Sequence, residues 1–268
     1  MAGRLAGKVA FVSGAARGQG RAHAVRLVEE GADVIAFDIC SQLETVPYPM
    51  AVSEDLKETV RLVEELDRRI VAREADARDT AAVNALVDEG VAEFGRIDIV
   101  CANAGIVSFA ENAWSLSDEQ WDEMIEVNLT GVFKTVRAAV PHMIAAGNGG
   151  SIVLTSSTAG LKGMPGIAHY ASAKHGLVGL MRTLALELAP HSIRVNTVHP
   201  TGVNTPMVVN DVSAALLDDN LAGDMMNALP VTMLEPVDIS NAIVWLSSDE
   251  GRYVTGVALP VDAGFAIK

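Results

Sequence analysis

A tyrosine and a lysine that could exchange a proton together lie four residues apart, at Tyr170 and Lys174. Residues at this spacing share one face of a helix, so the ammonium group would lie one turn from the phenol. A phenol titrates near 10 in water, and a nearby positive charge stabilises the phenolate. The pair could therefore act as an acid/base near neutral pH, although a half-buried aromatic residue beside a solvated lysine would have the same spacing.

A glycine-rich segment near the N-terminus has the composition of a phosphate-binding loop. Residues 14–20 follow the apolar run 9–12 and open a helical stretch. In that context glycines permit a tight turn and a close approach to a pyrophosphate, whose charge then lies at the helix N-terminus. The residues of this loop that we expect to bind a dinucleotide are Gly14, Arg17, Gly18, Gln19 and Gly20.

The second apolar run ends at a carboxylate, Asp38. A carboxylate at this place in a dinucleotide-binding unit bonds the adenosine ribose and repels a 2′-phosphate, which favours NAD over NADP. Arg17 favours the opposite choice, because a basic residue in the glycine loop can meet a 2′-phosphate. We give Asp38 more weight because a buried clash of charges is costly. A helix-capping or turn aspartate is the alternative.

The elements that must position these residues follow a regular alternation. Short β-rich runs are expected at residues 9–12, 33–37, 70–74, 97–102, 151–154, 193–198 and 257–261. Helices are expected at residues 21–30, 54–69, 80–94, 118–146, 170–189 and 237–246. Such alternation is typical of a parallel sheet covered by helices. The sequence predicts an α/β fold, with residues 1–268 forming a single doubly wound Rossmann-type domain around a seven-stranded parallel sheet.

Two further segments follow strands of this predicted sheet. Asp76 and Ala77 come after the third run, and Asn103, Ala104 and Gly105 come after the fourth. By themselves these would be turn signals. Because open α/β sheets bind their ligands at the carboxyl ends of the strands, we expect both segments to contact the cofactor.

The chain carries the glycine loop, the 103–105 segment, Asn128, Ser157, Tyr170 and Lys174 in this order. By this order it resembles the short-chain dehydrogenase/reductase family over nearly its whole length. The resemblance implies that Tyr170 is the general acid/base and that Lys174 lowers its pKa and holds the nicotinamide ribose. It also implies that Ser157 binds the substrate oxygen and that Asn128 anchors a proton-relay water. Taken alone, Asn128 would be an exposed residue of the expected helix 118–146.

The same resemblance decides between neighbouring residues and extends to the C-terminal third. The usual spacing, thirteen positions before the tyrosine, selects Ser157 over Ser156. The segment after the sixth run is similar to the nicotinamide loop of the family, although a threonine, residue 201, replaces the usual glycine after proline. Its residues expected to contact the cofactor are Pro200, Val203 and Thr205. The resemblance also implies a homotetramer.

A narrower resemblance rests on residues 39–53, which connect the second strand to its helix over an unusually long distance. With the flanking 54–60 and 69–76 segments, this insertion is similar to the mycofactocin-associated, carveol-dehydrogenase-like subgroup. That resemblance implies NAD that does not exchange freely and a separate redox carrier. The Pro-Tyr-Pro turn at 47–49 is stiff and could cover the adenosine site. A rigid surface loop is the alternative.

Residues 205–230 are rich in Met, Val and Leu and also contain several aspartates, as expected of an amphipathic substrate lid. An apolar lid favours a small apolar alcohol or ketone as substrate, for example a cyclic or terpenoid secondary alcohol oxidised with NAD. Packing against a neighbouring subunit is the alternative for this segment. The rival functions are an NADPH-dependent carbonyl reductase of biosynthesis and a catalytically silent dinucleotide-binding protein.

Composition restricts the partners. The chain has 268 residues, 50% of them hydrophobic, and a formal net charge of -14, which disfavours nucleic acid and anionic membranes as partners. No apolar run reaches the roughly 18 residues of a membrane span. No signal-peptide region precedes the first run, so we expect a cytoplasmic protein. We interpret four residues as packing residues: the two cysteines, and His169 and His199 beside the expected site. The spacing of His, Asp and Glu residues offers no set of metal ligands.

Overall fold

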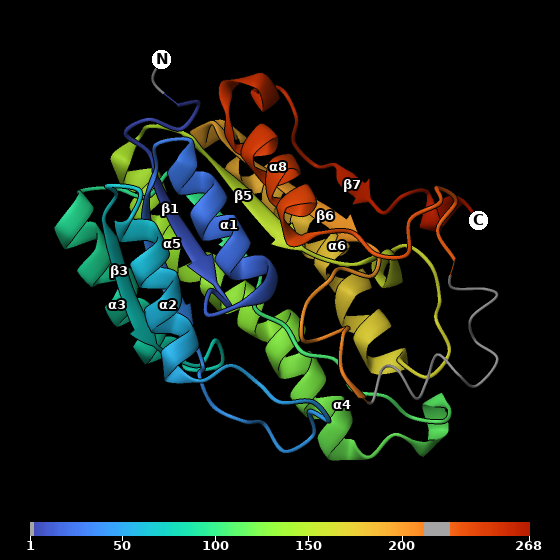
Figure 1. Ribbon diagram of the computed structural model, residues 1–268. Coiled ribbons are helices and arrows are strands. Elements are labelled where there is room, and N and C mark those ends of the chain that lie inside the picture. The colour runs from blue at the N-terminus through green and yellow to red at the C-terminus, as the bar shows by residue number, and fades with distance from the viewer. Residues whose placement is uncertain (1–2, 212–225) are drawn as a thin grey trace.

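Figure 1 shows a computed structural model of the chain, which describes residues 3–211 and 226–268. Seven parallel strands form one sheet in the order β3-β2-β1-β4-β5-β6-β7. The strands are β1 Val9–Ser13, β2 Asp33–Asp38, β3 Ile70–Glu74, β4 Ile99–Ala102, β5 Gly150–Thr155, β6 Ile193–Pro200 and β7 Ala258–Val261. The predicted single Rossmann-type domain with a seven-stranded parallel sheet is confirmed.

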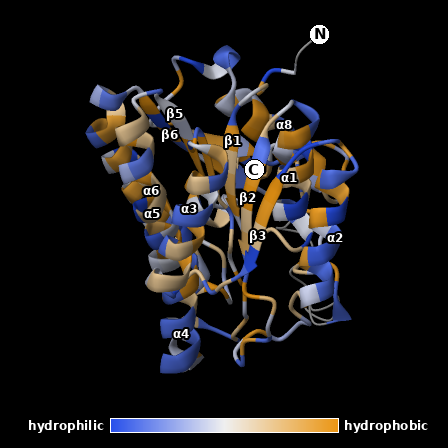
Figure 2. Ribbon diagram, turned by 90° about the vertical axis from the view of Figure 1, so that its left-hand side faces the viewer, coloured by the Kyte–Doolittle hydropathy of each residue, from blue (hydrophilic) through white to orange (hydrophobic). Residues whose placement is uncertain are grey.

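Helices cover both faces of this sheet. Their bounds are α1 Gly18–Glu29, α2 Ser53–Glu64, α3 Thr80–Phe94, α4 Asp118–Ile125, α5 Val132–Ala146, α6 Ala168–Leu188 and α8 Pro236–Ser247. In Figure 2, α3, α5 and α6 lie on one side of the strands and α1, α2 and α8 on the other. None of the helices in the described parts of the chain has the length and apolarity needed to cross a membrane.

The alternation of side chains along the strands creates two hydrophobic cores. Phe11 and Ile35 pack with the helices α3, α5 and α6, whereas Val12 and Val34, one residue away in each strand, pack with α1 and α8. Successive strand residues point to opposite faces, and a sheet buried on both faces needs apolar residues at every position. This explains why the strand sequences are continuous apolar runs.

The strand order places the ligand crevice at one point of the sheet. From β1 the chain moves outward to β2 and β3, and it then returns to the other side of β1 with β4. Ligands bind at such a reversal, outside the carboxyl ends of the strands. The glycine loop after β1 and the 103–105 segment after β4 both lie at this reversal.

Several expected boundaries differ from the structure by one to five residues, and three differences bear on the site. The helix expected to reach residue 69 ends at Glu64, because a turn with Asp67 at φ +55° precedes β3. The helix expected at 118–146 contains a π-helical turn, Glu126–Gly131, between α4 and α5. Since α2 begins at Ser53, the insertion is a loop of residues 39–52. Of the expected lid at 205–230, residues 212–225 lie outside the described part of the chain.

Candidate active site

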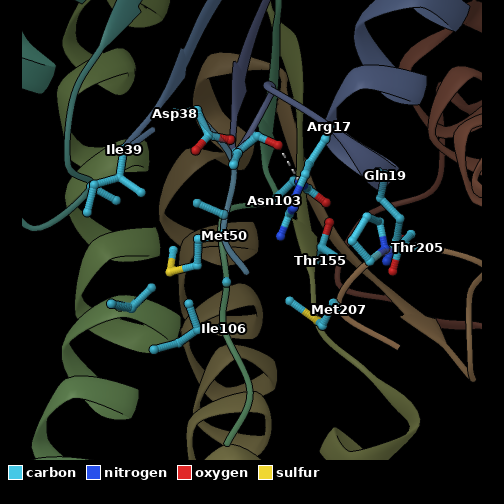
Figure 3. A pocket seen from close by; sticks show the side chains of 18 of the residues that line it. Arg17, Gln19, Asp38, Ile39, Met50, Asn103, Ile106, Thr155, Thr205 and Met207 are labelled. Carbon is cyan, nitrogen blue, oxygen red and sulfur yellow. Dashed lines mark hydrogen bonds between the residues drawn. The ribbon is translucent and has the colours of Figure 1, made fainter. Parts of the chain in front are cut away.

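One cleft at the carboxyl ends of the strands gathers the expected site residues. Of those expected to bind the cofactor or act in catalysis, the residues that line it are Gly14, Arg17, Gly18, Gln19, Asp38, Asp76, Ala77, Asn103, Ala104, Gly105, Ser157, Tyr170, Lys174, Pro200, Val203 and Thr205. Gly20 and Asn128 are buried behind its wall. In Figure 3, Asp38 and Arg17 lie toward the upper part of the cleft and Ile106 and Met207 toward the lower part.

The glycine loop is shaped by close backbone approaches. Gly14 and Gly18 have φ of +67° and +54°, where side chains are strongly disfavoured. A Cβ on Gly14 would lie 2.8 Å from the Cα of Ala104, and one on Gly20 would lie 1.9 Å from the carbonyl oxygen of Gly14. The loop therefore needs all three glycines to keep β1, β4 and α1 this close together.

The start of α1 fits a dinucleotide pyrophosphate. Arg17 occupies the N-cap position, but its side chain makes no capping hydrogen bond to the helix. The first N–H groups of a helix lack intrahelical partners and favour a bound anion. The first N–H groups of α1 in this glycine cradle therefore suit a phosphate ligand, and the Gln19 side chain in the same turn also lines the cleft.

Ser13, which sequence reasoning missed, ties the glycine loop to β4. Its Oγ accepts hydrogen bonds from the backbone N–H groups of Asn103 and Ala104, each at 3.0 Å. The side-chain Nδ2 of Asn103 in turn donates to the Ser13 carbonyl oxygen at 3.2 Å. The expected contact segment 103–105 is thus held against the loop by a buried hydroxyl at the end of β1, a position that carries no sequence signal of its own.

Asp38 lies at the end of β2, where the adenosine ribose was expected. Its Oδ2 accepts a hydrogen bond from the Ala16 N–H at 3.0 Å, and its Oδ1 accepts one from the Cys40 N–H at 3.3 Å. Burial raises the pKa of Asp38 above its ordinary value, although these backbone donors and the charge of Arg17 oppose the rise. The Arg17 guanidinium itself donates to the Pro49 carbonyl oxygen in the insertion. One guanidinium nitrogen of Arg17 is therefore engaged with the insertion.

Two neighbouring serines after β5 have different partners. Ser156 is buried, and its Oγ donates to the Lys174 carbonyl oxygen at 2.9 Å, which ties β5 to α6. Ser157 lies at the cleft, where its Oγ accepts from the Ala159 N–H at 3.1 Å and interacts with Tyr170. The geometry therefore gives Ser156 a structural bond and leaves Ser157 beside the tyrosine.

Lys174 is buried, whereas Tyr170 is half-buried at the cleft. Burial raises the pKa of Tyr170, and its hydrogen bond with Ser157 opposes that rise without cancelling it. The Lys174 Nζ lies 5.5 Å from the centre of the Tyr170 ring and donates to the Thr155 carbonyl oxygen at 2.9 Å. Burial lowers the pKa of Lys174 to about 8. Burial thus raises the pKa of Tyr170 in the NAD-free chain, and the role of Lys174 in lowering that pKa stays a prediction.

Asn128 is fully buried, unlike the exposed helix residue that its position suggested. It lies in the π-helical turn between α4 and α5, a feature often found at functional sites. Its Oδ1 accepts from the Ile106 N–H at 2.8 Å, and its Nδ2 donates to the Ile106 carbonyl oxygen at 2.8 Å. A Cβ on Gly105 would lie 2.9 Å from this Oδ1. Asn128 thus shapes the loop after β4, and its proton-relay role stays a prediction.

The insertion is a packed part of the cleft wall. Leu43, Val46 and Tyr48 are buried and form a cluster with residues of the loop after β4 and of α4. The Tyr48 hydroxyl oxygen accepts a hydrogen bond from the Val107 N–H at 3.2 Å. Within the loop, the Gln42 side-chain amide donates to three backbone carbonyl oxygens at 3.0–3.3 Å. The insertion therefore has a defined shape and bridges from β2 to the opposite side of the cleft.

The outer end of the insertion lies beside α4 (Figure 1), where an ionic network of side chains holds it. The Thr45 hydroxyl donates to Glu123 Oε2 at 2.5 Å, and Arg78 donates to Glu123 Oε1 at 3.1 Å. Arg78 also forms hydrogen bonds of 2.7–3.1 Å with both carboxylate oxygens of Asp76. The Asp76 carboxylate, which lies at the end of β3 in the cleft, is thus linked to the insertion through two side chains.

The remaining candidates are packing residues. Cys101 is buried in β4, and Cys40 follows β2 at φ +48°; both are free thiols. His169 is buried, and its Nε2 hydrogen-bonds the Ser108 hydroxyl at 2.8 Å. No group of three or more His, Cys, Asp and Glu residues in the described part of the chain could hold a metal ion. The cleft residues that sequence reasoning missed are Phe37, Ala75, Ile106, Val127 and Thr155.

Known proteins match this fold and site. A family model described as enoyl-(acyl carrier protein) reductase matches residues 14–266. The chain is 50% identical to (-)-trans-carveol dehydrogenase of Rhodococcus erythropolis, with 99% of each chain covered. Its structure is similar to the crystal structure of carveol dehydrogenase from Mycobacterium avium in complex with NAD, with a TM-score of 0.97 and 54% sequence identity. The comparison covers 99% of this chain and 100% of the other.

A second solved structure agrees with the first. A short chain dehydrogenase from Mycobacterium paratuberculosis bound to NAD is 48% identical, with a TM-score of 0.95 over 99% of this chain and 100% of the other. The chain belongs to the short-chain dehydrogenase/reductase family. It is accordingly an oxidoreductase that acts on CH–OH groups, which confirms the class that the order of motifs indicated.

Proposed function

We propose that this enzyme oxidises an apolar secondary alcohol to a ketone with NAD as its cofactor. The observation that carries the proposal is a single cleft that has the glycine loop and Asp38 at one end and Ser157, Tyr170 and Lys174 at the other. The first end suits an adenosine diphosphate without a 2′-phosphate. The second brings proton-transfer groups to the same cleft.

The cleft residues divide the chemistry among them. Tyr170 takes the hydroxyl proton of the alcohol, and Ser157 holds the oxygen as its charge develops. NAD, when bound, accepts the hydride and carries a positive charge on its oxidised ring. Because burial raises the pKa of Tyr170, the tyrosine needs such an additional positive charge before it can act as a base. Lys174 holds the nicotinamide ribose.

Apolar side chains around the tyrosine support an apolar substrate. Ile106, Val127 and Met207 line this part of the cleft together with Tyr48 of the insertion. An uncharged ring would bury its surface against these side chains, whereas a charged substrate would lose its hydration there. A cyclic or terpenoid alcohol fits this environment, and the name of the carveol dehydrogenase relative agrees with that substrate class.

The insertion supports NAD that exchanges slowly. The loop 39–52 joins the adenosine end of the cleft to α4 through buried apolar side chains, the Tyr48 hydroxyl and the Thr45 contact to Glu123. If this bridge lies over the cofactor, release must wait for it to open. NADH formed on a retained cofactor would have to be reoxidised in place, with its two electrons passing to a separate, mycofactocin-like redox carrier. A homotetramer in the cytoplasm remains the expected state.

Analysis of the purified protein tests the proposal. Native mass spectrometry should find NAD bound without addition, and a panel of alcohols should be oxidised with an artificial electron acceptor. Apolar secondary alcohols should exceed charged hydroxy acids by at least roughly tenfold in kcat/KM, since burial of a charge costs several kcal/mol. A preference for NADP, or for charged substrates, would overturn the assignment. Rapid exchange of added NAD with the bound cofactor would refute the slow release of NAD but not the proposed oxidation.

A further inference from the structure

A buried histidine lies directly behind the serine of the cleft. His199 is fully buried near the end of β6 and is not one of the cleft-lining residues. Its Nδ1 lies 2.7 Å from the carbonyl oxygen of Ser157, and its Nε2 lies 2.7 Å from the hydroxyl of Thr197. The ring therefore joins two strands of the sheet at the edge where the cleft opens.

These partners determine the protonation of the ring. A carbonyl oxygen can only accept a hydrogen bond, so Nδ1 carries the proton and donates to Ser157. Nε2 is then the acceptor, and the Thr197 hydroxyl donates to it. Burial lowers the pKa of His199, while the Ser157 bond raises it; the lowered value keeps the ring neutral. A neutral ring with one fixed tautomer has a single orientation, as a positioning group requires.

The backbone ladder between β5 and β6 ends just before Ser157. The β5–β6 ladder reaches the pair Thr155 and Val198, and the Ser156 N–H still donates to the Val198 carbonyl oxygen. The next donor along β6 would belong to Pro200, which has no N–H. The ladder cannot continue from there. Beyond the end of the ladder, Ser157 has extended dihedrals of φ -167° and ψ 165°, and its carbonyl oxygen accepts the hydrogen bond from the imidazole.

We propose that His199 is a positioning residue for the reaction, acting through the backbone of Ser157 to aim its hydroxyl at Tyr170 and the substrate oxygen. The inference rests on the proposed role of Ser157. A serine displaced by about 1 Å costs up to roughly a hundredfold in rate. His199 would therefore affect turnover without touching substrate or cofactor.

A double-mutant cycle tests this role on the NAD-loaded enzyme, with carveol and an artificial electron acceptor. His199→Leu should lower kcat by roughly 10- to 100-fold while KM and NAD content change little. His199→Asn should recover most of the loss, because its Nδ2 can donate where Nδ1 did. In the Ser157→Ala background, His199→Leu should have almost no further effect, because both changes act through one hydroxyl.

Titration of Tyr170 in the NAD-free protein gives a second readout. Tyrosine-selective carbon-13 NMR should show a higher Tyr170 pKa in His199→Leu and in Ser157→Ala, and no additional rise in the double variant, since the Ser157 bond lowers this pKa. Independent effects of the two changes, or a His199→Asn variant as poor as His199→Leu, would overturn the positioning role. An unaltered rate and titration in Ser157→Ala alone would instead refute the role proposed for Ser157.

Discussion

Replacing residues 46–49 of the insertion with Gly-Ser-Gly-Ser should accelerate NAD release. The change removes Val46 and Tyr48, whose side chains are 5% and 4% exposed, and the hydrogen bond from the Val107 N–H to the Tyr48 hydroxyl. Burial of each side chain is worth about 1.5–3 kcal/mol and the hydrogen bond about 1 kcal/mol. The total is an upper limit because an open loop keeps some contacts.

Half of that total, about 3 kcal/mol, corresponds to a release rate at least a hundredfold faster, since each 1.4 kcal/mol is a factor of ten. The rate is measured by loading the enzyme with radiolabelled NAD and following its loss into excess unlabelled NAD. Glu44→Ser is the matched control, because this side chain lies in the same loop but is exposed. It should release NAD at the wild-type rate.

Two results would refute this reasoning in different ways. Rapid release from wild type and variant alike would mean that the insertion does not retain the cofactor. Slow release from both would mean that retention comes from the glycine loop and Asp38, and that the packed bridge contributes little. Rapid release from a variant that stays folded by circular dichroism, with slow release from Glu44→Ser, would support the bridge as the barrier.

Three other changes test the cleft. Tyr170→Phe should lose at least roughly a hundredfold in rate while NAD content is kept, and near-normal turnover would exclude Tyr170 as the base. Asp38→Ala should narrow the preference for NAD over NADP in binding measurements, whereas an unchanged ratio would show that other groups exclude the 2′-phosphate. Lys174→Met should stabilise the NAD-free protein in urea at pH 7, because the pKa of Lys174 falls from 10.5 to about 8 on folding. That gain in stability should shrink as pH rises above 8, because Lys174 then loses its proton in the folded wild type and no longer buries a charge. A gain that does not depend on pH would contradict the lowered pKa of Lys174.

Local patterns in the sequence determined the fold and most of the cleft. Strand runs, the glycine loop and the position of Asp38 all act over a few neighbouring residues, where backbone geometry restricts the choices strongly. The four-residue spacing of Tyr170 and Lys174 survives in α6 because helical periodicity is a local property. These residues could be named without knowing which strands are neighbours.

Only the tertiary structure decided which side chains are paired and which are desolvated. Asn128 is buried because a π-helical turn packs it against the loop after β4, and His199 meets Ser157 because β5 and β6 are adjacent. Burial also raises the pKa of Tyr170, a direction that the four-residue spacing does not indicate. The fold also brings the Pro49 carbonyl oxygen to the Arg17 guanidinium, a contact that no local pattern indicated. Each of these outcomes depends on segments far apart in the chain, whose approach no local pattern encodes.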